Sequence, residues 1–326
     1  MRKIVIIGAG NVGGQIALFL INEAPAHIIL LDVVIGLVKG KALDLEDAAG
    51  VLKRDCVIEG SDDFSLLKDA DIIVVTAGLA RQPGMSRDDL LRKNSEIIRD
   101  VSLKIKEFAP LETTGQPGKG KMPLTGRAKN PIVIVVTNPV DLMTYLVSRL
   151  TGFDKKRVFG MGISLDAARF ANLIRESLSI PVSTVEAMVM GSHGQTMVPL
   201  ASLSKARGAP IERLINREIV AKLARATVER GASIVAHLGS GSAYFGPAAA
   251  VCNIIRAIVR DEKRIIGVCA YLNGEYGING LHIGVPARIG KDGVEAVIEL
   301  KLSKEEKEAF VKSCDSIRQQ INTLAI

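Results

Sequence analysis

Short apolar runs alternate with amphipathic stretches from the first residues of the chain. Ile4 to Ile7 form one apolar run, His27 to Leu31 contain a second, and Ile16, Ala17 and Leu20 recur between them at helical spacing. A continuous apolar run suits a strand buried on both faces, whereas the spacing between the runs suits one face of a helix. The pattern predicts a strand, a helix and a second strand at the start of the chain.

The same alternation continues through the first half of the chain. Further strands are predicted at residues 57–59, 71–76 and 132–137, with a long helix over about residues 89–108. Strands that alternate with helices favour a parallel, doubly wound sheet. We therefore expect residues 1–141 to form one α/β domain.

The order of elements becomes less regular after Asn138-Pro139. Helices are predicted near residues 165–178, 217–237 and 247–260, and β segments near residues 185–190, 265–271 and 281–289. A last helix should begin at Ser303, which forms a capping-box pattern with Glu306, and its apolar stripe comprises Phe310, Cys314, Ile317, Ile321 and Leu324. This mixture predicts an α+β domain over residues 142–326.

One segment, Leu111 to Lys129, does not fit the alternation. It is rich in Gly, Pro, Thr and Lys and reads as a loop inserted between a helix and the next strand. Such connections emerge at the amino ends of parallel strands, opposite the edge where ligands bind. We expect the insertion to lie far from the chemistry.

The glycine-rich start of the chain has two possible interpretations. A secretory leader is one, because Arg2 and Lys3 precede an apolar run and small residues follow near Ala24. The other is a turn that holds a phosphate group. Four glycines and the polar residues Asn11 and Gln15 interrupt the apolar run, and a leader helix would not favour them.

The phosphate-binding interpretation explains these interruptions. Gly8-x-Gly10-x-x-Gly13 directly follows a predicted strand and opens a predicted helix, and Ala9, Asn11 and Val12 fill the positions between. This is the strand–turn–helix context that a dinucleotide-binding Rossmann motif requires. Asp32 ends the second apolar run about twenty residues further on, where a carboxylate can accept hydrogen bonds from the adenosine ribose and repel a 2′-phosphate. The motif favours NAD over NADP.

Composition narrows the class of protein further. The chain has 326 residues with 42 Lys and Arg against 35 Asp and Glu, which gives a net charge of +7, and 4% of its residues are aromatic. Few aromatic residues argue against nucleic-acid binding, and no apolar run reaches the length of a membrane span. Four scattered cysteines show no zinc-site spacing, so we expect no metal and a reducing cytoplasmic location.

Two short segments in the second half carry the reactive groups. Histidine exchanges a proton near neutral pH, which makes His193 in "GSHGQTMVP" a candidate acid and base. Asp166 in "SLDAARF" is a candidate to fix its tautomer. Arg169 lies one helical turn beyond Asp166 and could hold a substrate carboxylate beside the pair.

A third segment, "TAGLARQPGMSRDDL", follows the predicted strand at residues 71–76. Arg81 and Arg87 lie on it, together with Gly78, Pro83 and Gly84, so that it reads as a mobile lid over the cleft. Its place at the carboxyl edge of the sheet should bring both cations towards the nicotinamide half of the site.

These motifs together resemble the lactate/malate dehydrogenase family, and within it the lactate-dehydrogenase-like branch that acts on malate. The resemblance runs from end to end through GAGNVG with Asp32, TAGLARQPGMSRDDLL, NSEI, VTNPVD, LDAAR, HGQTMVP and GEYGINGLHIGVPARIG. It implies a Rossmann-type NAD-binding domain, a catalytic domain, and reversible oxidation of malate to oxaloacetate in the tricarboxylic acid cycle. It also implies a homotetramer or homodimer.

The resemblance implies a role for each matching position. His193 would accept the proton, Asp166 would orient it, Arg169 would bind the C1 carboxylate and Arg87 would polarise the carbonyl of oxaloacetate. Arg81 would bind the second carboxylate. The NAD site would comprise Gly8, Ala9, Gly10, Asn11, Val12, Gly13, Asp32, Asn94, Val136, Thr137 and Asn138, of which Asn138 would also contact the substrate.

Two departures from the family pattern keep alternatives open. Gln195 stands where the family usually has Asp, and Gln82 beside Arg81 could present a neutral amide if the loop shifted by one residue. Lactate dehydrogenases commonly carry Gln at the loop position. A lactate or broad 2-hydroxyacid dehydrogenase is therefore one alternative, and an NAD-binding protein without catalytic activity is the other.

Overall fold

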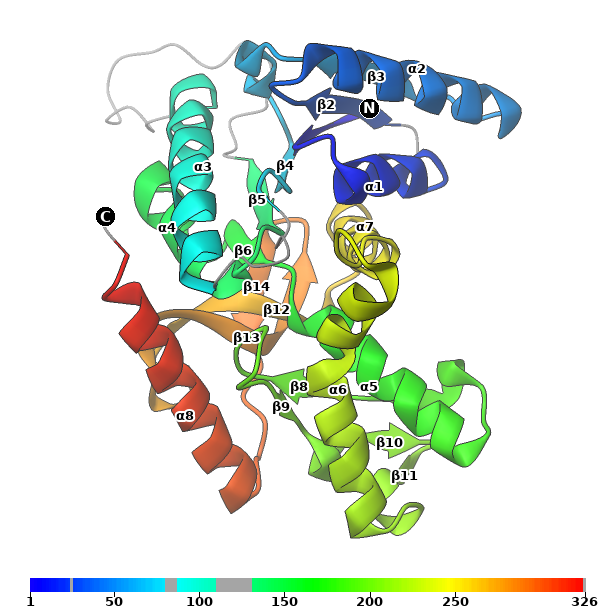
Figure 1. The fold of residues 1–326 in the computed structure, drawn as a ribbon, viewed down its shortest axis with the longest axis vertical. Helices are drawn as coiled ribbons and strands as arrows, with labels where there is room; N and C mark the ends of the chain where they lie inside the picture. Colours follow the sequence, from blue (N-terminus) through cyan, green and yellow to red (C-terminus); the bar gives the residue numbers. More distant parts are fainter. Residues whose placement is uncertain (24–25, 80–86, 110–130, 325–326) are drawn as a thin grey trace.

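The structure of the chain is a computed structural model that describes residues 1–23, 26–79, 87–109 and 131–324 (Figure 1). Its centre is a nine-stranded sheet with the strand order β14-β13-β12-β6-β5-β4-β1-β2-β3. The run from β3 to β6 is parallel throughout, as in a doubly wound sheet. These strands are β1 (Arg2–Ile7), β2 (Ala26–Leu31), β3 (Val57–Ser61), β4 (Ile72–Val75), β5 (Ile132–Val135) and β6 (Val158–Gly160). The predicted Rossmann-type fold is confirmed.

Three antiparallel strands extend this sheet into the second half of the chain. They are β12 (Arg264–Asn273), β13 (Asn279–Gly290) and β14 (Gly293–Val297), and β12 pairs with β6 through Cys269 and Gly160. The sheet therefore passes from one half of the chain to the other. Because β6 belongs to the parallel part, the division after residue 141 crosses a continuous sheet, and it stays a prediction.

Helices cover the sheet and build the lower part of the molecule in Figure 1. They are α1 (Asn11–Ile21), α2 (Ile35–Val51), α3 (Arg87–Phe108), α4 (Val140–Thr151), α5 (Ile163–Leu178), α6 (Arg217–Leu238), α7 (Phe245–Val259) and α8 (Lys304–Ile321). The hydrophobic pattern did not predict α2 and α4. Apolar Leu43 and Val51 are exposed on α2, so that helix shows no clear apolar stripe, whereas α4 carries a stripe of Met143, Leu146, Val147 and Leu150 and was nevertheless missed.

The predicted strand over residues 185–190 is two short strands in separate sheets. β7 (Val185–Glu186) pairs with β10 (Lys205–Ala206), which also pairs with β11 (Ala209–Pro210), whereas β8 (Val189–Met190) pairs with β9 (Val198–Pro199). Between β7 and β8 the backbone N–H of Met188 donates to the Ser204 hydroxyl, not to a strand neighbour. A side chain thus replaces the ladder where the run was expected to continue.

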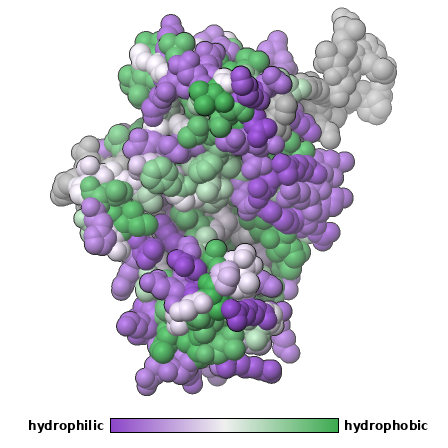
Figure 2. Space-filling view, turned by 90° about the vertical axis from the view of Figure 1, so that its right-hand side faces the viewer, coloured by the Kyte–Doolittle hydropathy of each residue, from purple (hydrophilic) through white to green (hydrophobic). Residues whose placement is uncertain are grey.

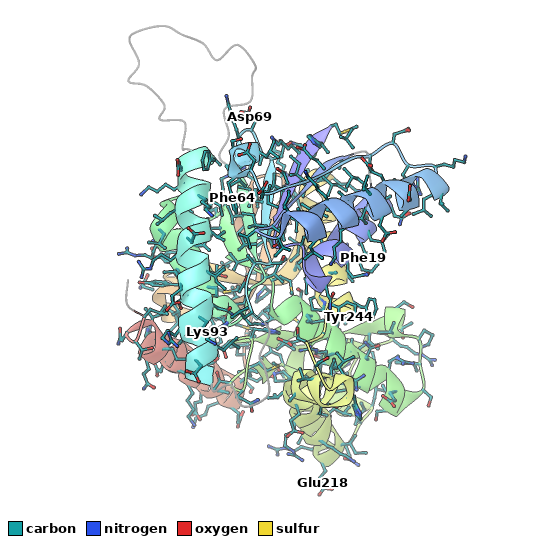
Figure 3. The ribbon with its side chains drawn as sticks, turned by 45° about the horizontal axis from the view of Figure 1, so that its top comes forward. Phe19, Phe64, Asp69, Lys93, Glu218 and Tyr244 are labelled. Atoms are coloured by element: carbon teal, nitrogen blue, oxygen red, sulfur yellow. The ribbon has the colours of Figure 1, made fainter. Side chains whose placement is uncertain are left out.

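Short 3₁₀ helices complete the connections. They are η1 (Phe64–Leu67), η2 (Val182–Thr184), η3 (Ala201–Leu203), η4 (Ile211–Arg213) and η5 (Glu275–Gly277). Figure 3 shows Phe64 of η1 beside α3, where the Lys104 ammonium lies 4.2 Å from the centre of its ring.

The last helix has the predicted cap and stripe. The Ser303 hydroxyl accepts from the Glu306 N–H, and the Glu306 carboxylate accepts from the Ser303 N–H, which is a complete capping box. Phe310, Cys314 and Ile317 are buried in the core. The stripe therefore packs α8 against the rest of the molecule.

One continuous core of buried apolar residues extends from β1 to α8, and a second cluster fills the space around α5 and β8. Hydrophilic residues cover most of the face drawn in Figure 2, with smaller hydrophobic patches between them. In the ranges that the structure describes, no helix has both the length and the apolar content to span a membrane.

Candidate active site

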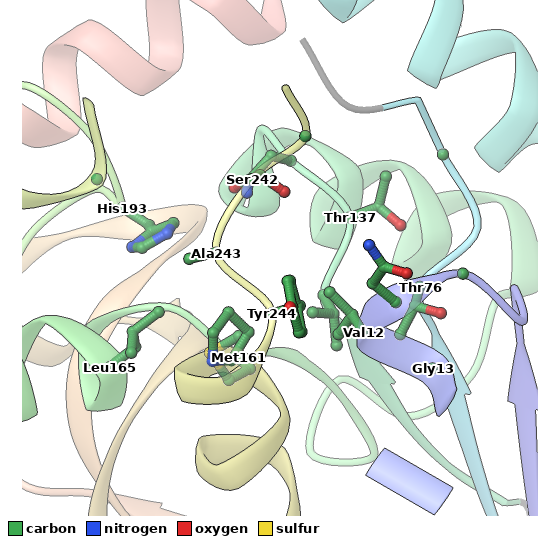
Figure 4. Close-up of a pocket in the computed structure, with 18 of the residues that line it drawn as sticks. Val12, Gly13, Thr76, Thr137, Met161, Leu165, His193, Ser242, Ala243 and Tyr244 are labelled. Atoms are coloured by element: carbon green, nitrogen blue, oxygen red, sulfur yellow. The ribbon is translucent and has the colours of Figure 1, made fainter. Parts of the chain in front are cut away.

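A cavity of about 440 Å³ joins the turn after β1 to the segment after β8. Gly10, Asn11, Val12 and Gly13 line one part of it, and His193 with Arg169 lines another. Figure 4 shows His193 and the Val12–Gly13 turn on opposite sides, with Ser242, Ala243 and Tyr244 between them in this view. The glycine-rich turn, which comprises Gly8 to Gly13, and the predicted proton-transfer group His193 therefore border one cavity.

The glycine-rich turn has the close packing that its motif requires. Gly8 has a positive φ of 103°, and a Cβ atom there would lie 2.6 Å from the backbone nitrogen of Ala77. A Cβ on Gly13 would overlap the carbonyl oxygen of Gly8, whereas one on Gly10 would meet no atom within 4 Å. Gly8 and Gly13 are thus needed by the fold, and Gly10 borders open space at the start of α1.

This difference predicts opposite results for two alanine substitutions. Gly13→Ala should destabilise the protein by about 1–3 kcal/mol through overpacking, which lowers Tm by several degrees. Gly10→Ala should leave Tm unchanged and weaken NADH binding, because its methyl group enters the cavity. Thermal unfolding and NADH fluorescence titration would measure both effects. Gly50→Ala, at another position with no neighbour within 4 Å, is the control for added volume, and it should keep or slightly raise Tm because alanine favours helix α2 more than glycine does. Equal Tm values for all three variants would contradict the packing argument.

Asp32 lies at the carboxyl end of β2 and holds the turn in place. Its carboxylate accepts hydrogen bonds from the backbone N–H groups of Ala9, at 2.7 Å, and Val34, at 3.1 Å. Lys41 of α2 approaches from the other side, and its ammonium donates to the Gly10 carbonyl at 3.0 Å. Burial lowers the pKa of Lys41, and the charge of Asp32 partly opposes that shift. Lys41 was missed from sequence because α2 itself was not predicted.

The carboxyl ends of β4 and β5 form the middle of the site. Val136, Thr137 and Asn138 line the cavity, as predicted. Asn94 of α3 is only 1% exposed, and its side-chain amide donates to the Asn138 carbonyl at 2.7 Å and accepts from the Leu79 N–H at 2.8 Å. Asn94 thus positions the strand ends, and its direct contact with a cofactor stays a prediction.

The predicted pair of His193 and Asp166 is in direct contact. The Nδ1 atom of His193, on the segment after β8, lies 2.6 Å from Oδ2 of Asp166, on the first turn of α5. Arg169 donates from Nη1 to the other Asp166 oxygen at 3.0 Å. The carboxylate is fully buried, whereas the His193 side chain is 14% exposed and borders the cavity. Nε2 is therefore the imidazole nitrogen that is not bound to Asp166.

Opposing effects act on the proton affinity of His193. Burial lowers its pKa, but the negative charge of Asp166, the hydrogen bond to that carboxylate and the charge of Asp141 raise it, and the net shift is upward from 6.5. Protonated His193 thus persists to higher pH than free histidine. Such a group can donate a proton near neutral pH and take it back.

Asp141 contacts the same histidine and was not predicted. Its Oδ2 atom accepts from the His193 backbone N–H at 2.9 Å, although the two residues are far apart in sequence. Asp141 belongs to VTNPVD, in which sequence reasoning assigned a site role only to the first three residues. No local spacing shows that α4 and the segment after β8 meet.

Several predicted positions lie outside the described residues. These are Arg81, Gln82 and the insertion from Leu111 to Lys129, whereas Arg87 begins α3 but its side chain is not described. Gln195 is exposed, two residues beyond His193. The predicted roles of the two loop arginines and the remote position of the insertion therefore stay predictions.

Comparison with known proteins agrees with this arrangement. A sequence model of the lactate/malate dehydrogenase NAD binding domain matches residues 2–114 and 122–160, and one of the alpha/beta C-terminal domain matches residues 163–325. The residues left unmatched between 114 and 122 lie within the predicted insertion.

Individual relatives match over the whole length. Malate dehydrogenase of Methanosarcina acetivorans is 43% identical over 326 residues and covers 100% of both chains. The structure of malate dehydrogenase from Aeropyrum pernix matches with a TM-score of 0.88 at 38% identity and covers 98% of each chain. Lactate dehydrogenase from Eimeria maxima with NADH and oxamate matches with a TM-score of 0.90 at 33% identity, over 99% of this chain and 94% of that one. This chain therefore belongs to the lactate/malate dehydrogenase family.

Proposed function

We propose that this chain catalyses the reversible NAD-dependent oxidation of (S)-malate to oxaloacetate. The observation that carries the proposal is the cavity lined by both Gly10 to Gly13 and His193, which supports a dinucleotide and a proton acceptor acting on one substrate. Relatives named malate dehydrogenase at 40–43% identity support malate over lactate as the substrate.

The residues at the end of β1 fit a dinucleotide. The first turn of α1 carries no acidic side chain, Gly10 borders open space, and Asp32 presents a carboxylate beside the turn. The helix N-terminus would bind the pyrophosphate and Asp32 the adenosine ribose. The chemistry that NAD supplies when bound is acceptance of a hydride at its nicotinamide ring.

His193 performs the proton transfer in this mechanism. Its Nδ1 side is held by Asp166 at 2.6 Å, so Nε2 can accept the proton of the malate C2 hydroxyl as the C2 hydride leaves. The buried Asp166 carboxylate stabilises the imidazolium that forms and fixes the ring orientation. In the reverse direction the protonated His193 returns its proton to the carbonyl oxygen of oxaloacetate.

Arginines bind the substrate in the proposal. Arg169 donates one N–H to Asp166, and the other N–H groups of its guanidinium can bind the C1 carboxylate. Gly231 of α6 lies opposite, where a Cβ would come 3.6 Å from Nη1 of Arg169, so the guanidinium is closely covered. We assign the second carboxylate to Arg81, polarisation of the carbonyl to Arg87, and orientation of the reacting oxygen to Asn138.

The choice of cofactor gives the direct test of this function. The purified protein should oxidise NADH when oxaloacetate is added and use NADPH at least about tenfold less well, because the Asp32 carboxylate repels a 2′-phosphate. Absorbance at the nicotinamide wavelength measures both rates. Equal use of the two cofactors would contradict the assignment of Asp32, and no turnover with either would favour a binding protein without activity.

A homotetramer or homodimer and a cytoplasmic location also belong to the proposal. Exposed apolar side chains on and before α2, including Val33, Leu43 and Val51, support burial against another copy of the chain. Cys252, Cys269 and Cys314 are buried thiols that form no disulfide, which supports a reducing compartment.

A further inference from the structure

Asp141 is a second buried carboxyl group beside His193. It occupies the first turn of α4 and is 3% exposed. Its Oδ2 atom holds the main-chain N–H of His193 at 2.9 Å, whereas Asp166 holds the ring at Nδ1. His193 is therefore fixed at two points, by two carboxyl groups from different helices.

The other oxygen of Asp141 lies in an almost wholly buried space. Among the described residues, Oδ1 has no hydrogen-bond partner of ordinary length, although the Cys269 thiol also stabilises the Asp141 carboxylate. The ionisable groups that face the carboxyl group are His193 after β8, Asp166 of α5, Cys269 of β12 and Cys314 of α8. None of these groups is permanently positive. Among them, only His193 can carry a positive charge, when it is protonated, and so pair electrostatically with the Asp141 carboxylate.

We propose that Asp141 is a positioning residue, which anchors the main chain of His193 and supplies a second negative charge to its protonated imidazole. The proposal rests on the proposed function, because it assigns His193 the proton transfer. A buried carboxylate is costly unless it is compensated, and the gain of a proton by His193 provides that compensation. Proton uptake by the imidazole is thus favoured by both carboxylates.

The proton affinities of the two groups agree with this geometry. Burial raises the pKa of Asp141 to about 6, although the hydrogen bond from the His193 N–H and the charge of His193 lower it. In turn, against burial and the positive charge of Arg169, which lower the pKa of His193, the charge of Asp141 adds to that of Asp166 in raising it. Above about pH 6 Asp141 is charged and supports the imidazolium. As the pH falls below that value it binds a proton and this support is lost.

Asp141→Asn removes the charge and keeps an oxygen that can accept from the His193 N–H. Oxaloacetate reduction needs protonated His193, and loss of the Asp141 charge makes the imidazole lose its proton at lower pH. The alkaline limb of the pH profile of kcat/KM should therefore move down by roughly 0.5–1 pH unit, so that kcat/KM on that limb falls about three- to tenfold. The affinity for NADH, measured by fluorescence titration, should not change. A purely structural role would alter Tm or NADH binding and leave the limb in place.

Two further variants make the test specific. Asp141→Glu keeps the charge and displaces the oxygens, so it should lower kcat several-fold and leave the limb at its original pH; it also serves if Asp141→Asn does not fold. Asp315→Asn removes the carboxylate from the exposed ion pair of Asp315 with Arg318 on α8. It should change neither kcat nor the pH of the alkaline limb. An unmoved limb in Asp141→Asn, or a limb shifted down in Asp141→Glu, would overturn the proposal. Loss of NADH binding in Asp141→Asn alone would show that Asp141 has a structural role and would overturn the proposal. Absence of turnover in the unsubstituted protein would instead refute the proposed function.

Discussion

His193→Asn is expected to lower kcat for oxaloacetate reduction by about 10²- to 10⁴-fold, because the reacting oxygen loses its proton donor. Asn retains a polar group of similar size but cannot exchange a proton near neutral pH. NADH affinity and Tm should stay close to those of the unsubstituted protein, since the glycine-rich turn lies across the cavity from the histidine. Stopped-flow measurement of NADH oxidation, with a separate NADH titration, distinguishes chemistry from binding.

A matched histidine variant makes this result interpretable. His237 is exposed in the last turn of α6, and His237→Asn should leave kcat unchanged. A kcat within a few-fold of normal in His193→Asn would show that another group transfers the proton. In that case the contact with Asp166 would be structural only.

Arg81→Gln is expected to reverse the substrate preference. An arginine enclosed with a dicarboxylate gains an anionic partner from oxaloacetate, whereas pyruvate leaves the cation without one. Leaving one partner of a buried ion pair uncompensated costs about 3–5 kcal/mol. With oxaloacetate, Arg81→Gln should therefore lower kcat/KM by about a hundredfold to several thousandfold, and kcat/KM for pyruvate should rise.

Arg54→Gln provides the charge control for this comparison. Arg54 is exposed after α2, so its substitution removes one positive charge without reaching the cavity. It should leave both substrates unaffected. If Arg81→Gln behaves like Arg54→Gln, then Gln82 occupies the specificity position and the loop is displaced by one residue.

The first half of the fold was largely predictable from the sequence. Buried strands such as β1, β2 and β4 contain short continuous apolar runs. The glycine spacing after β1 is typical of a turn that joins a strand to a helix. The position of Arg169 on the same helix face as Asp166 followed from helical spacing alone, whereas the hydrogen bond between them was not predicted. Local patterns of this kind depend on neighbours in sequence, which is why they can be recognised without coordinates.

The remaining features depend on contacts that no local pattern contains. The hydrogen bond of Asp141 to His193 joins α4 to the segment after β8, and the bond of Lys41 to Gly10 joins α2 to the turn before α1. The break between β7 and β8 depends on the Ser204 hydroxyl, which reaches Met188 only in the folded chain. α2 lacks an apolar stripe, so the pattern that identifies other helices was absent there, whereas α4 has one in Met143, Leu146, Val147 and Leu150 and was predictable.

The central claim is most directly tested by steady-state kcat/KM with NADH, compared between oxaloacetate and pyruvate for the purified, unsubstituted protein. Our account predicts a preference for oxaloacetate of about a hundredfold or more, since the second carboxylate of oxaloacetate would pair with Arg81 and pyruvate would leave that cation without an anion. Equal or better use of pyruvate would contradict it and make the chain a lactate dehydrogenase. NADH binding without turnover of either substrate would contradict it differently, by showing that the cavity binds the cofactor but has lost its chemistry.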